Sequence, residues 1–547
     1  MANPPAAMTA PPLSAAAIAM NRFGLGARAD EAPPADPKSW LVAQFDTYQP
    51  MPAAWADQPT SLAIAAELAQ QRQHALANAA ASSTNAASAS ASGANAGGAP
   101  ANTANTANTA NTANTANTAN TANTANTANT ANTANTANTA NTATADDARK
   151  AARQAANKAV RMEARDTYRS AVNARFASAL TTPAPFVERL VHFWANHFAV
   201  SIDKGQVASF AGAFEAEAIR PHVLGRFEDM LVAAERHPAM QLFLDQTRSV
   251  GPDSAAAMRA AQRNPNRKPG LNENLAREIM ELHTLGVRSG YTQGDVTEFA
   301  RAMTGWSIAG AQGPQPNNAP PGAFVFRAQL HEPGTRTIMG RRYDQPGEGQ
   351  TLAVLHDLST SPATATHIAT KLARHFVADN PPPDVVDRLA TAFMHSRGDL
   401  PTVYRALIDS DAAWSPVAVK FKSPWEWAIS ALRGLGMRDL NNASSGNGTV
   451  QMAPVLTQLG QQVWRPGSPA GYDDIAASWA APDALVRRVE IAQRIASRVG
   501  DRIDPRSLGQ TLMAGSLSEP TELAVSRAES ASTALALLLV SPDFLRR

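Results

Sequence analysis

Apolar side chains return every three or four residues along most of this chain, which is the spacing that places them on one face of an α-helix. In residues 146–180, an apolar residue recurs at every fourth position from Val160 to Leu180. Similar stripes predict helices over residues 13–23, 39–48, 60–80, 185–200, 210–220, 226–237, 482–499 and 528–540. Only residues 323–343 alternate as a strand does, and they predict a short β-hairpin with its turn at Pro333-Gly334. The pattern therefore predicts an all-α fold: one large multi-helix domain with one short β-hairpin.

The helical pattern stops after residue 80, where the composition changes to Ala, Ser, Asn and Gly. From Ala101 to Thr142 the chain repeats Ala-Asn-Thr fourteen times without a charged residue. Such a segment has too little apolar bulk to offset the entropy lost on ordering, although a short-repeat solenoid is an alternative. We predict that residues 81–145 form a disordered low-complexity insertion at the tip of a helical hairpin, and that residues 1–12 are also disordered. Residues 13–80 and 146–547 then form one helical domain.

Two adjacent helices are predicted in residues 269–308, the most informative part of the chain. The first ends at Gly286, since glycine adopts the left-handed conformation that a C-terminal cap requires. The second begins at Thr292, with Asp295 placed three residues later for a capping box. Residues 248–269, which precede this stretch, contain Gly, Pro and Asn among basic residues and predict a mobile loop.

The polar faces of these two helices carry five carboxylates and three arginines between residues 272 and 306, but no lysine. Arginine without lysine favours fixed, bidentate pairing with carboxylates. The aromatic helix at 185–200 also has polar side chains within an apolar face, and these need partners. The candidate functional cluster combines both sets with one histidine of the predicted hairpin: His192, Asn196, His197, Asn272, Glu273, Asn274, Arg277, Glu278, Glu281, His283, Asp295, Glu298, Arg301 and His331. We predict an Arg–carboxylate contact within residues 272–306, and either His192 or His197 within reach of that stretch.

Three interpretations of this cluster are compatible with the residues. Carboxylates on facing helices could hold a divalent metal, or divide acid and base roles, in a hydrolase-type or metal-dependent enzyme. The same groups could recognise a polar or cationic partner in a binding or accessory/assembly module. They could also form an Arg–carboxylate network that only holds two helices in register. Of the functional interpretations we favour the binding or assembly module, with the enzyme as the alternative; catalytic residues, metal and cofactor stay unassigned.

The amino-acid composition excludes several classes of function. The 547 residues include no cysteine, which excludes disulfides and thiolate chemistry. A net charge of +2 is too small to imply a nucleic-acid or membrane partner, and the basic residues of the 146–180 helix alternate with acids, so we predict no nucleic-acid binding. No apolar run is long enough for a transmembrane segment. The apolar patch from Leu13 to Met20 has no basic residue before it, as a secretory signal would need, so the cytoplasm is the default location and the periplasm the alternative.

Several segments resemble the bacterial family catalogued as domain of unknown function 1800. The strongest are NENLAREIMELHTLGV at 272–287 and GYTQGDVTEFARAMTGW at 290–306; the others, in the family's order, include MNRFGLGA, HFWANHFAVS, KLARHFV, FKSPWEWAISALRGLG and LGQQVWRPGSPAGY. The chain departs from the family pattern at His237, Gln246 and the pair His331-Glu332. The resemblance implies a shared fold and no established activity. It also implies a partner, a protein of the domain of unknown function 1501 family, whose genes often neighbour those of this family.

Overall fold

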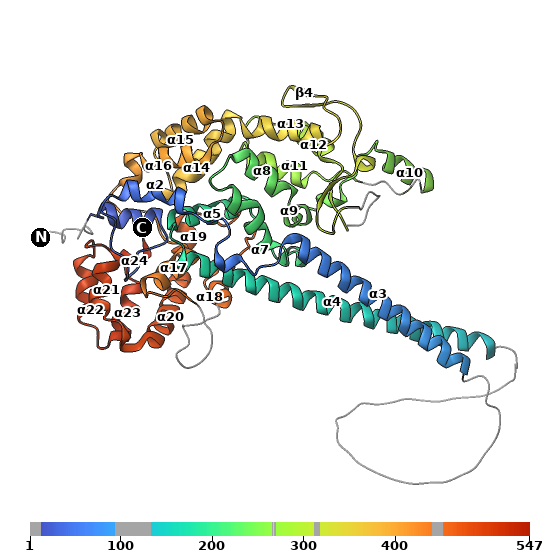
Figure 1. Ribbon diagram of the computed structural model, residues 1–547, viewed down its shortest axis with the longest axis horizontal. Coiled ribbons are helices and arrows are strands. Elements are labelled where there is room, and N and C mark those ends of the chain that lie inside the picture. Colours follow the sequence, from blue (N-terminus) through green and yellow to red (C-terminus); the bar gives the residue numbers. More distant parts are fainter. Residues whose placement is uncertain (1–11, 93–132, 265, 267–269, 311–317, 440–451) are drawn as a thin grey trace, which may run out of the picture. The chain divides into compact units, whose positions relative to one another are not determined.

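The computed structural model describes residues 12–92, 133–264, 266, 270–310, 318–439 and 452–547 (Figure 1). The chain divides into two compact units. The larger unit joins the N-terminal part, up to Glu67, with Glu163–Arg547, and the smaller unit is Leu68–Met162. The predicted all-α fold is confirmed, since helices dominate the described residues.

Two long helices, α3 (Ser61–Ser92) and α4 (Thr133–Thr181), supply the described residues of the smaller unit. Both extend further into the low-complexity stretch than predicted, because α3 passes residue 80 and α4 begins before residue 146. The alanine content of these extensions favours helix, and alanine is the strongest helix former. The central part of the predicted disordered insertion, residues 93–132, lies outside the described residues, as do residues 1–11 of the predicted N-terminal segment.

The aromatic helix α5 (Pro185–His197) forms the centre of the larger unit, and all of its residues except Asn196 are buried. It packs on α2 (Pro37–Thr47) and on two π-helical turns, Ala19–Phe23 and Glu215–Ile219. The ring of Phe186 contacts rings from several segments of the chain: Phe23, Phe45, Phe376 and Tyr404. Aromatic pairs of this kind add stability beyond the area they bury. The apolar face of this helix therefore lies in the core.

The remaining helices of the larger unit surround this centre. Before the strands they are α1 (Ala15–Ile18), α6 (Gly205–Ala208), α7 (Ala211–Phe214), α8 (Phe227–Arg236), α9 (Pro238–Phe243), α10 (Ala255–Arg263), α11 (Asn274–Glu278) and α12 (Gln293–Met303). After the strands they are α13 (Glu348–Ser359), α14 (Pro362–Phe376), α15 (Pro383–Ser396), α16 (Leu400–Ile408), α17 (Pro424–Gly434), α18 (Met452–Gln458), α19 (Ala476–Trp479), α20 (Pro482–Val499), α21 (Pro505–Leu512), α22 (Glu519–Ser526), α23 (Ala531–Leu539) and α24 (Pro542–Leu545). Consecutive helices α14, α15 and α16 pack together, as do α20 to α23 (Figure 1).

The strands differ from the prediction of one hairpin across 323–343. In the described residues, β1 (Trp306–Ile308) pairs antiparallel with β2 (Phe324–Phe326), and β3 (Arg336–Ile338) pairs antiparallel with β4 (Arg341–Tyr343). The tight turn is at Met339-Gly340, whose φ angles of 50° and 77° are both positive. A two-residue hairpin turn favours positive φ at both central positions, and proline cannot adopt it, so the predicted turn at Pro333-Gly334 was wrong.

The predicted mobile loop at 248–269 was also wrong in part, because α10 lies within it. Ser254 caps that helix by accepting a hydrogen bond from the backbone N–H of Ala257. The alanines that follow Ser254 are strong helix formers, and they outweigh the scattered turn residues around them.

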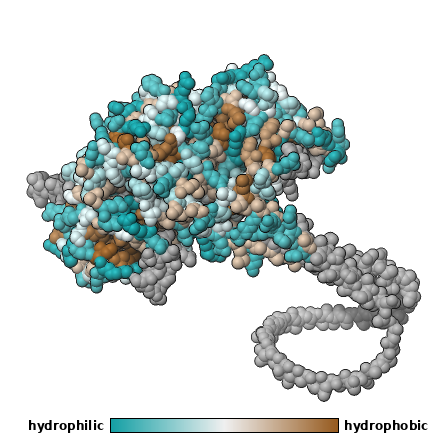
Figure 2. Space-filling model, viewed as in Figure 1, coloured by the Kyte–Doolittle hydropathy of each residue, from teal (hydrophilic) through white to brown (hydrophobic). Residues whose placement is uncertain are grey.

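On the face seen in Figure 2, hydrophobic residues of the larger unit lie in separate patches among hydrophilic ones. No helix within the described ranges is both long enough and apolar enough to cross a membrane.

Candidate functional site

The predicted polar seam lies between α11 and α12, at the surface of the larger unit. Arg277 Nη2 is 3.1 Å from Glu273 Oε2, and Arg277 Nη1 is 3.3 Å from Glu281 Oε1. The predicted Arg–carboxylate contact is therefore confirmed. All three side chains are between a quarter and about a third exposed.

Glu273 also joins α11 to α12. Its carboxylate accepts hydrogen bonds from Thr297 Oγ1 at 2.7 Å and from Gln293 Nε2 at 2.8 Å. The hydrogen bond from Thr297 is the largest influence that lowers the pKa of Glu273. At the start of α12, the predicted capping box between Thr292 and Asp295 is confirmed, and Asp295 also accepts from the Met339 N–H of the β3–β4 turn at 2.6 Å. These contacts fix the two helices to each other and to the hairpin.

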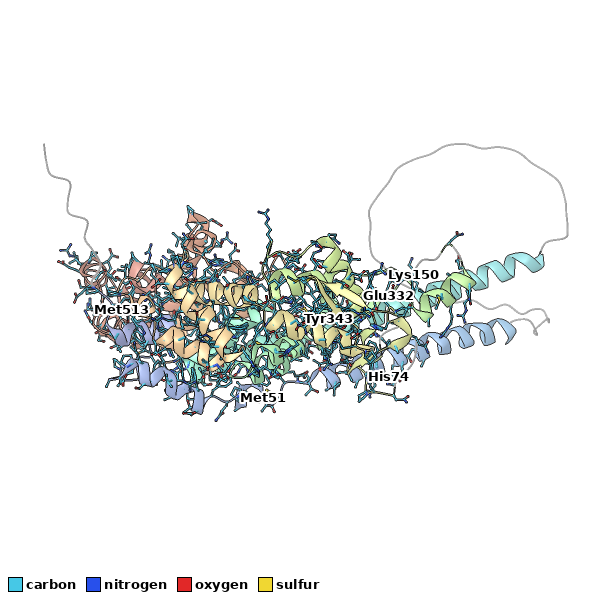
Figure 3. The ribbon with its side chains drawn as sticks, turned by 90° about the horizontal axis from the view of Figure 1, so that it is seen from above. Met51, His74, Lys150, Glu332, Tyr343 and Met513 are labelled. Atoms are coloured by element: carbon cyan, nitrogen blue, oxygen red, sulfur yellow. The ribbon has the colours of Figure 1, made fainter. Side chains whose placement is uncertain are left out.

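A second network follows at the other end of α12. Glu298 lies 3.3 Å from Arg301 and 3.2 Å from Arg336, and Arg301 lies 2.7 Å from the buried Glu332, which is labelled in Figure 3. His331 Nδ1 donates to the Thr304 carbonyl at 2.9 Å. The charged groups at this end of α12 are thus paired within the protein.

Three members of the predicted cluster between residues 272 and 278 take no part in these pairs. Asn272 Nδ2 donates to the carbonyls of Leu244 and Asp245, at 3.1 and 2.9 Å, so it fixes a loop. Asn274 is exposed. Within the described residues Glu278 forms no hydrogen bond or ion pair, and burial raises its pKa. In the same described ranges, no three His, Asp or Glu side chains stand together as a metal site would require.

The two histidines of α5 have different partners. His197 Nε2 donates to the His283 carbonyl at 3.1 Å, so one of the two does reach the 272–306 stretch, as predicted. His283 Nδ1 in turn lies 2.7 Å from Glu235, and both side chains are buried. His192 points elsewhere: its Nδ1 accepts from Trp425 Nε1 at 3.0 Å, and its Nε2 lies 3.6 Å from Glu188. Burial lowers the pKa of His192 to about 3, so it is neutral.

A cavity of about 320 Å³ opens beside α5, and the charged residues of the seam do not line it. Three of the predicted residues, His192, Asn196 and His197, line it. The other walls come from α14, from the start of α17, from residues 461–474, and from single residues of neighbouring elements. Asn196 holds the 461–474 segment in place, since its amide donates to the Tyr472 carbonyl at 2.8 Å and accepts from the Tyr472 N–H at 2.7 Å.

One carboxylate of the cavity, Glu426, is held by arginines. It forms an ion pair with Arg189, and Arg547 Nη2 lies 2.8 Å from its Oε1. Ser423 N–H donates to its other oxygen at 2.9 Å, which completes a capping box at the start of α17. Burial alone would raise the pKa of Glu426, but the two guanidinium groups hold it below its ordinary value. Glu426 is therefore ionised and fully paired.

A second carboxylate, Asp474, pairs with the imidazole of His375. His375 Nδ1 donates to Asp474, and Lys420 Nζ lies 3.4 Å from the other carboxylate oxygen. Burial opposes ionisation, but His375 and Lys420 hold the pKa of Asp474 below its ordinary value. His375 Nε2 is buried and has no hydrogen-bond partner. An imidazole oriented by a carboxylate, with its second nitrogen unpaired, is an arrangement that acid–base catalysts use.

Two cations of the cavity, Lys371 and Arg374, have no carboxylate partner. Both lie on α14, three residues apart, and both are partly buried. Arg374 Nε donates to the Asp379 carbonyl at 3.2 Å. Within the described residues, neither side chain has a carboxylate oxygen within 4.0 Å, the limit for an ion pair. Burial is the main cause that lowers the pKa of Lys371 to about 8.

Sequence reasoning missed Lys371, Arg374, His375, Glu426 and Asp474 as site residues. The cavity draws on four of the segments that carry the family resemblance: 192–201, 371–377, 421–436 and 459–472. One feature of the sequence could have identified these residues: charged side chains recur within the apolar helical stripes of those segments. Their convergence depends on contacts between residues about 100 or more positions apart, which helical periodicity does not encode.

The comparisons with known proteins agree with the resemblance. The family model described as "Protein of unknown function (DUF1800)" matches residues 18–546, nearly the whole chain. Nothing among the curated proteins and nothing among the solved structures matches the chain.

Proposed function

The chain belongs to the DUF1800 family, whose description assigns no activity, and on that premise we propose that it is a binding protein that holds a small polar ligand in the cavity beside α5. The observation that carries the proposal is the convergence of polar side chains from four segments on one cavity. The volume, about 320 Å³, falls at the lower end of the range of small-molecule sites, roughly 300–1,000 Å³.

The walls of the cavity support ligand binding. Phe193, Trp425 and Trp464 supply apolar surface, while His375, Lys371 and Gln461 supply polar groups. Small-molecule sites combine mostly apolar walls with a few polar groups that fix the orientation of the ligand. The cavity has this composition.

The exposed seam between α11 and α12 is less suited to a ligand. Glu273, Arg277 and Glu281 already pair with one another, and Glu298 pairs with arginines. Partly exposed ion pairs contribute about 0–1 kcal/mol each, so their role is to keep helices in register rather than to supply binding energy. We assign the seam a structural role.

A second candidate function is acid–base catalysis in the same cavity, which the His375–Asp474 pair favours. The predicted alternative was an enzyme that uses the carboxylates and histidines of residues 272–298. The pair in the cavity offers a better oriented base than any group of the seam, because Asp474 fixes the imidazole and leaves Nε2 unpaired. The metal-dependent form of that alternative has no support in the described residues, where no group of three ligating side chains is found.

The proposal is tested by native mass spectrometry of the protein purified from its host without denaturation. We expect a bound small molecule that is released on unfolding. Ala470→Trp places a bulky ring at the mouth of the cavity, at an exposed position, and should abolish this bound species. The matched control, Ala53→Trp, lies at an exposed position outside the cavity and should retain it. An empty wild-type protein, or retention of the ligand in Ala470→Trp, would refute the proposal.

The predicted partnership with a protein of the domain of unknown function 1501 family stays a prediction, as does the predicted absence of nucleic-acid binding. A ligand cavity is compatible with an accessory role, since a bound small molecule can be delivered to a partner.

A further inference from the structure

We propose that the ligand of this cavity is a small anion, a carboxylate or a phosphate, and that Lys371 and Arg374 of α14 are its counter-charges. This inference rests on the proposed function, because it names the chemical class of the ligand for the same site.

The first argument is the position of the two cations. Side chains three residues apart on a helix lie on the same face, and both Lys371 and Arg374 line the cavity. Lys371 is a compact point charge, whereas Arg374 presents a planar fork that matches two oxygens of a carboxylate or phosphate. Together they provide the two kinds of cation that proteins use for such groups.

The second argument is that the carboxylates of the cavity already have other partners. Glu426 pairs with Arg189 and Arg547, and Asp474 pairs with His375 and Lys420. The third, Asp473, is exposed and accepts from Ser478 Oγ at 2.8 Å. Asp474 attracts Lys371 only from beyond the 4.0 Å limit of an ion pair. The positive charge of Lys371 and Arg374 is therefore not neutralised by a contact within the described residues.

The third argument is the electrostatic effect of Lys371 on its neighbours. Burial, followed by the charge of Lys371, lowers the pKa of His367 to about 4, and the same two causes lower the pKa of His197. Both imidazoles are thus neutral at pH 7, while Lys371 is mostly protonated. A partly buried cation without an ion-pair partner is unfavourable. An anion bound beside Lys371 would compensate this charge. Part of the binding energy of the anion would therefore come from pairing with a cation that has no partner in the free protein.

The size of the cavity limits the ligand to a compact molecule. About 320 Å³ accommodates a short mono- or dicarboxylate or a small phosphate ester, and it excludes a folded macromolecule. The neutral walls formed by Phe193 and Trp425 would contact the uncharged part of such a ligand.

The inference is tested by isothermal titration calorimetry of the full chain at pH 7 and constant ionic strength, after removal of any bound ligand by dialysis. The probes are inorganic phosphate, acetate, and acetamide as the neutral analogue of acetate. We expect phosphate or acetate to bind and acetamide not to bind. Lys371→Met should weaken binding of the anion at least tenfold, and Arg374→Gln should weaken it as well. Lys38→Met removes the same charge at an exposed position outside the cavity and should leave binding unchanged.

A folding control accompanies the titration, because Lys371→Met removes a buried charge. The melting temperature of this variant, without ligand, should equal or exceed that of the wild type. Lys371→Gln serves as a second variant of similar length that also lacks the charge. If phosphate binds more tightly than acetate, the ligand carries a phosphate group; if acetate binds more tightly, it carries a carboxylate.

The outcomes distinguish this inference from the proposed function. If acetamide binds as well as acetate, or if Lys371→Met and Lys371→Gln bind anions like the wild type, the anion inference is overturned. Absence of binding by both anions overturns it too. In each of these cases a neutral molecule that co-purifies with the wild type, and is lost in Ala470→Trp, would still uphold the proposed binding function.

Discussion

Two histidines of one helix show how much the environment of a residue decides its role. His192 and His197 both lie on α5, five positions apart, and both are buried. His192 accepts from Trp425, whereas His197 donates to the His283 carbonyl. The sequence indicated that each needs a partner, since both occur within an apolar helical stripe. The identity of the partner depends on which segments pack against α5, and no local pattern encodes that.

A carboxylate with cationic partners and one without them should respond differently to a Glu→Gln substitution. Glu426 is buried against Arg189 and Arg547, so Glu426→Gln leaves two buried cations uncompensated and should cost about 3–5 kcal/mol at pH 7. The folded-state pKa of Glu426 is depressed, so its contribution is present above the unfolded pKa of about 4.3 and is lost as the pH falls further. Urea denaturation of both proteins at several pH values measures the difference; equal stability at pH 7 would contradict the assignment.

Glu278→Gln should behave differently. Burial raises the pKa of Glu278 in the folded state, so the ionised carboxylate destabilises the folded protein. This loss of stability is absent below the unfolded-state pKa of about 4.3 and is complete once the pH exceeds the folded-state pKa. At pH 7 the substitution should therefore leave the melting temperature unchanged or raise it by about one or two degrees. A decrease of several degrees would show that Glu278 has a stabilising partner.

At the scale of elements, helical periodicity predicted most of the chain, and local turn chemistry accounts for the differences. The stripe of the 185–200 segment gave a helix that the structure shows as α5, and the cap at Thr292 was located correctly. The position of the hairpin turn was missed, because it depends on positive φ at Met339 and Gly340. The 461–474 segment has no periodicity, and its function as a wall of the cavity follows from its contacts with α5.

That segment supplies a prediction with a matched control. Gly471 has a φ of +85°, and a Cβ there would lie 2.2 Å from the Asn196 carbonyl oxygen. Gly471→Ala should therefore displace the segment from α5 and destabilise the protein by about 1–3 kcal/mol. Gly467 lies four residues earlier, and a Cβ there would meet nothing within 4 Å, so Gly467→Ala should change the melting temperature by at most about one degree. Equal thermal denaturation of the two variants would show that the contact with Asn196 is not needed.

At the scale of the whole molecule, the cavity and the low-complexity stretch belong to different units. The residues that line the cavity lie in the larger unit, whereas residues 68–162 form the smaller one. The sequence predicted that the stretch is an insertion from its composition alone. It could not predict the cavity, because His192, Lys371, Glu426 and Asp474 come together only when segments far apart in the chain are packed.

Deletion of the insertion should leave the larger unit intact. Removal of residues 82–143 takes away only residues of the smaller unit, so the melting temperature should stay within about two degrees of the wild-type value. Ligand binding in the cavity should be unchanged. A decrease of ten degrees in a thermal denaturation experiment, or loss of cooperative melting, would show that the larger unit depends on the insertion.

The measurement that tests the central claim most directly is a high-resolution crystal structure of the protein purified from its host. The account predicts a small molecule in the cavity beside α5, with a carboxylate or phosphate oxygen within hydrogen-bond distance of Lys371 Nζ. It also predicts that the seam between α11 and α12 holds no ligand. A cavity that contains only water, or a ligand bound at the seam instead, would contradict the account.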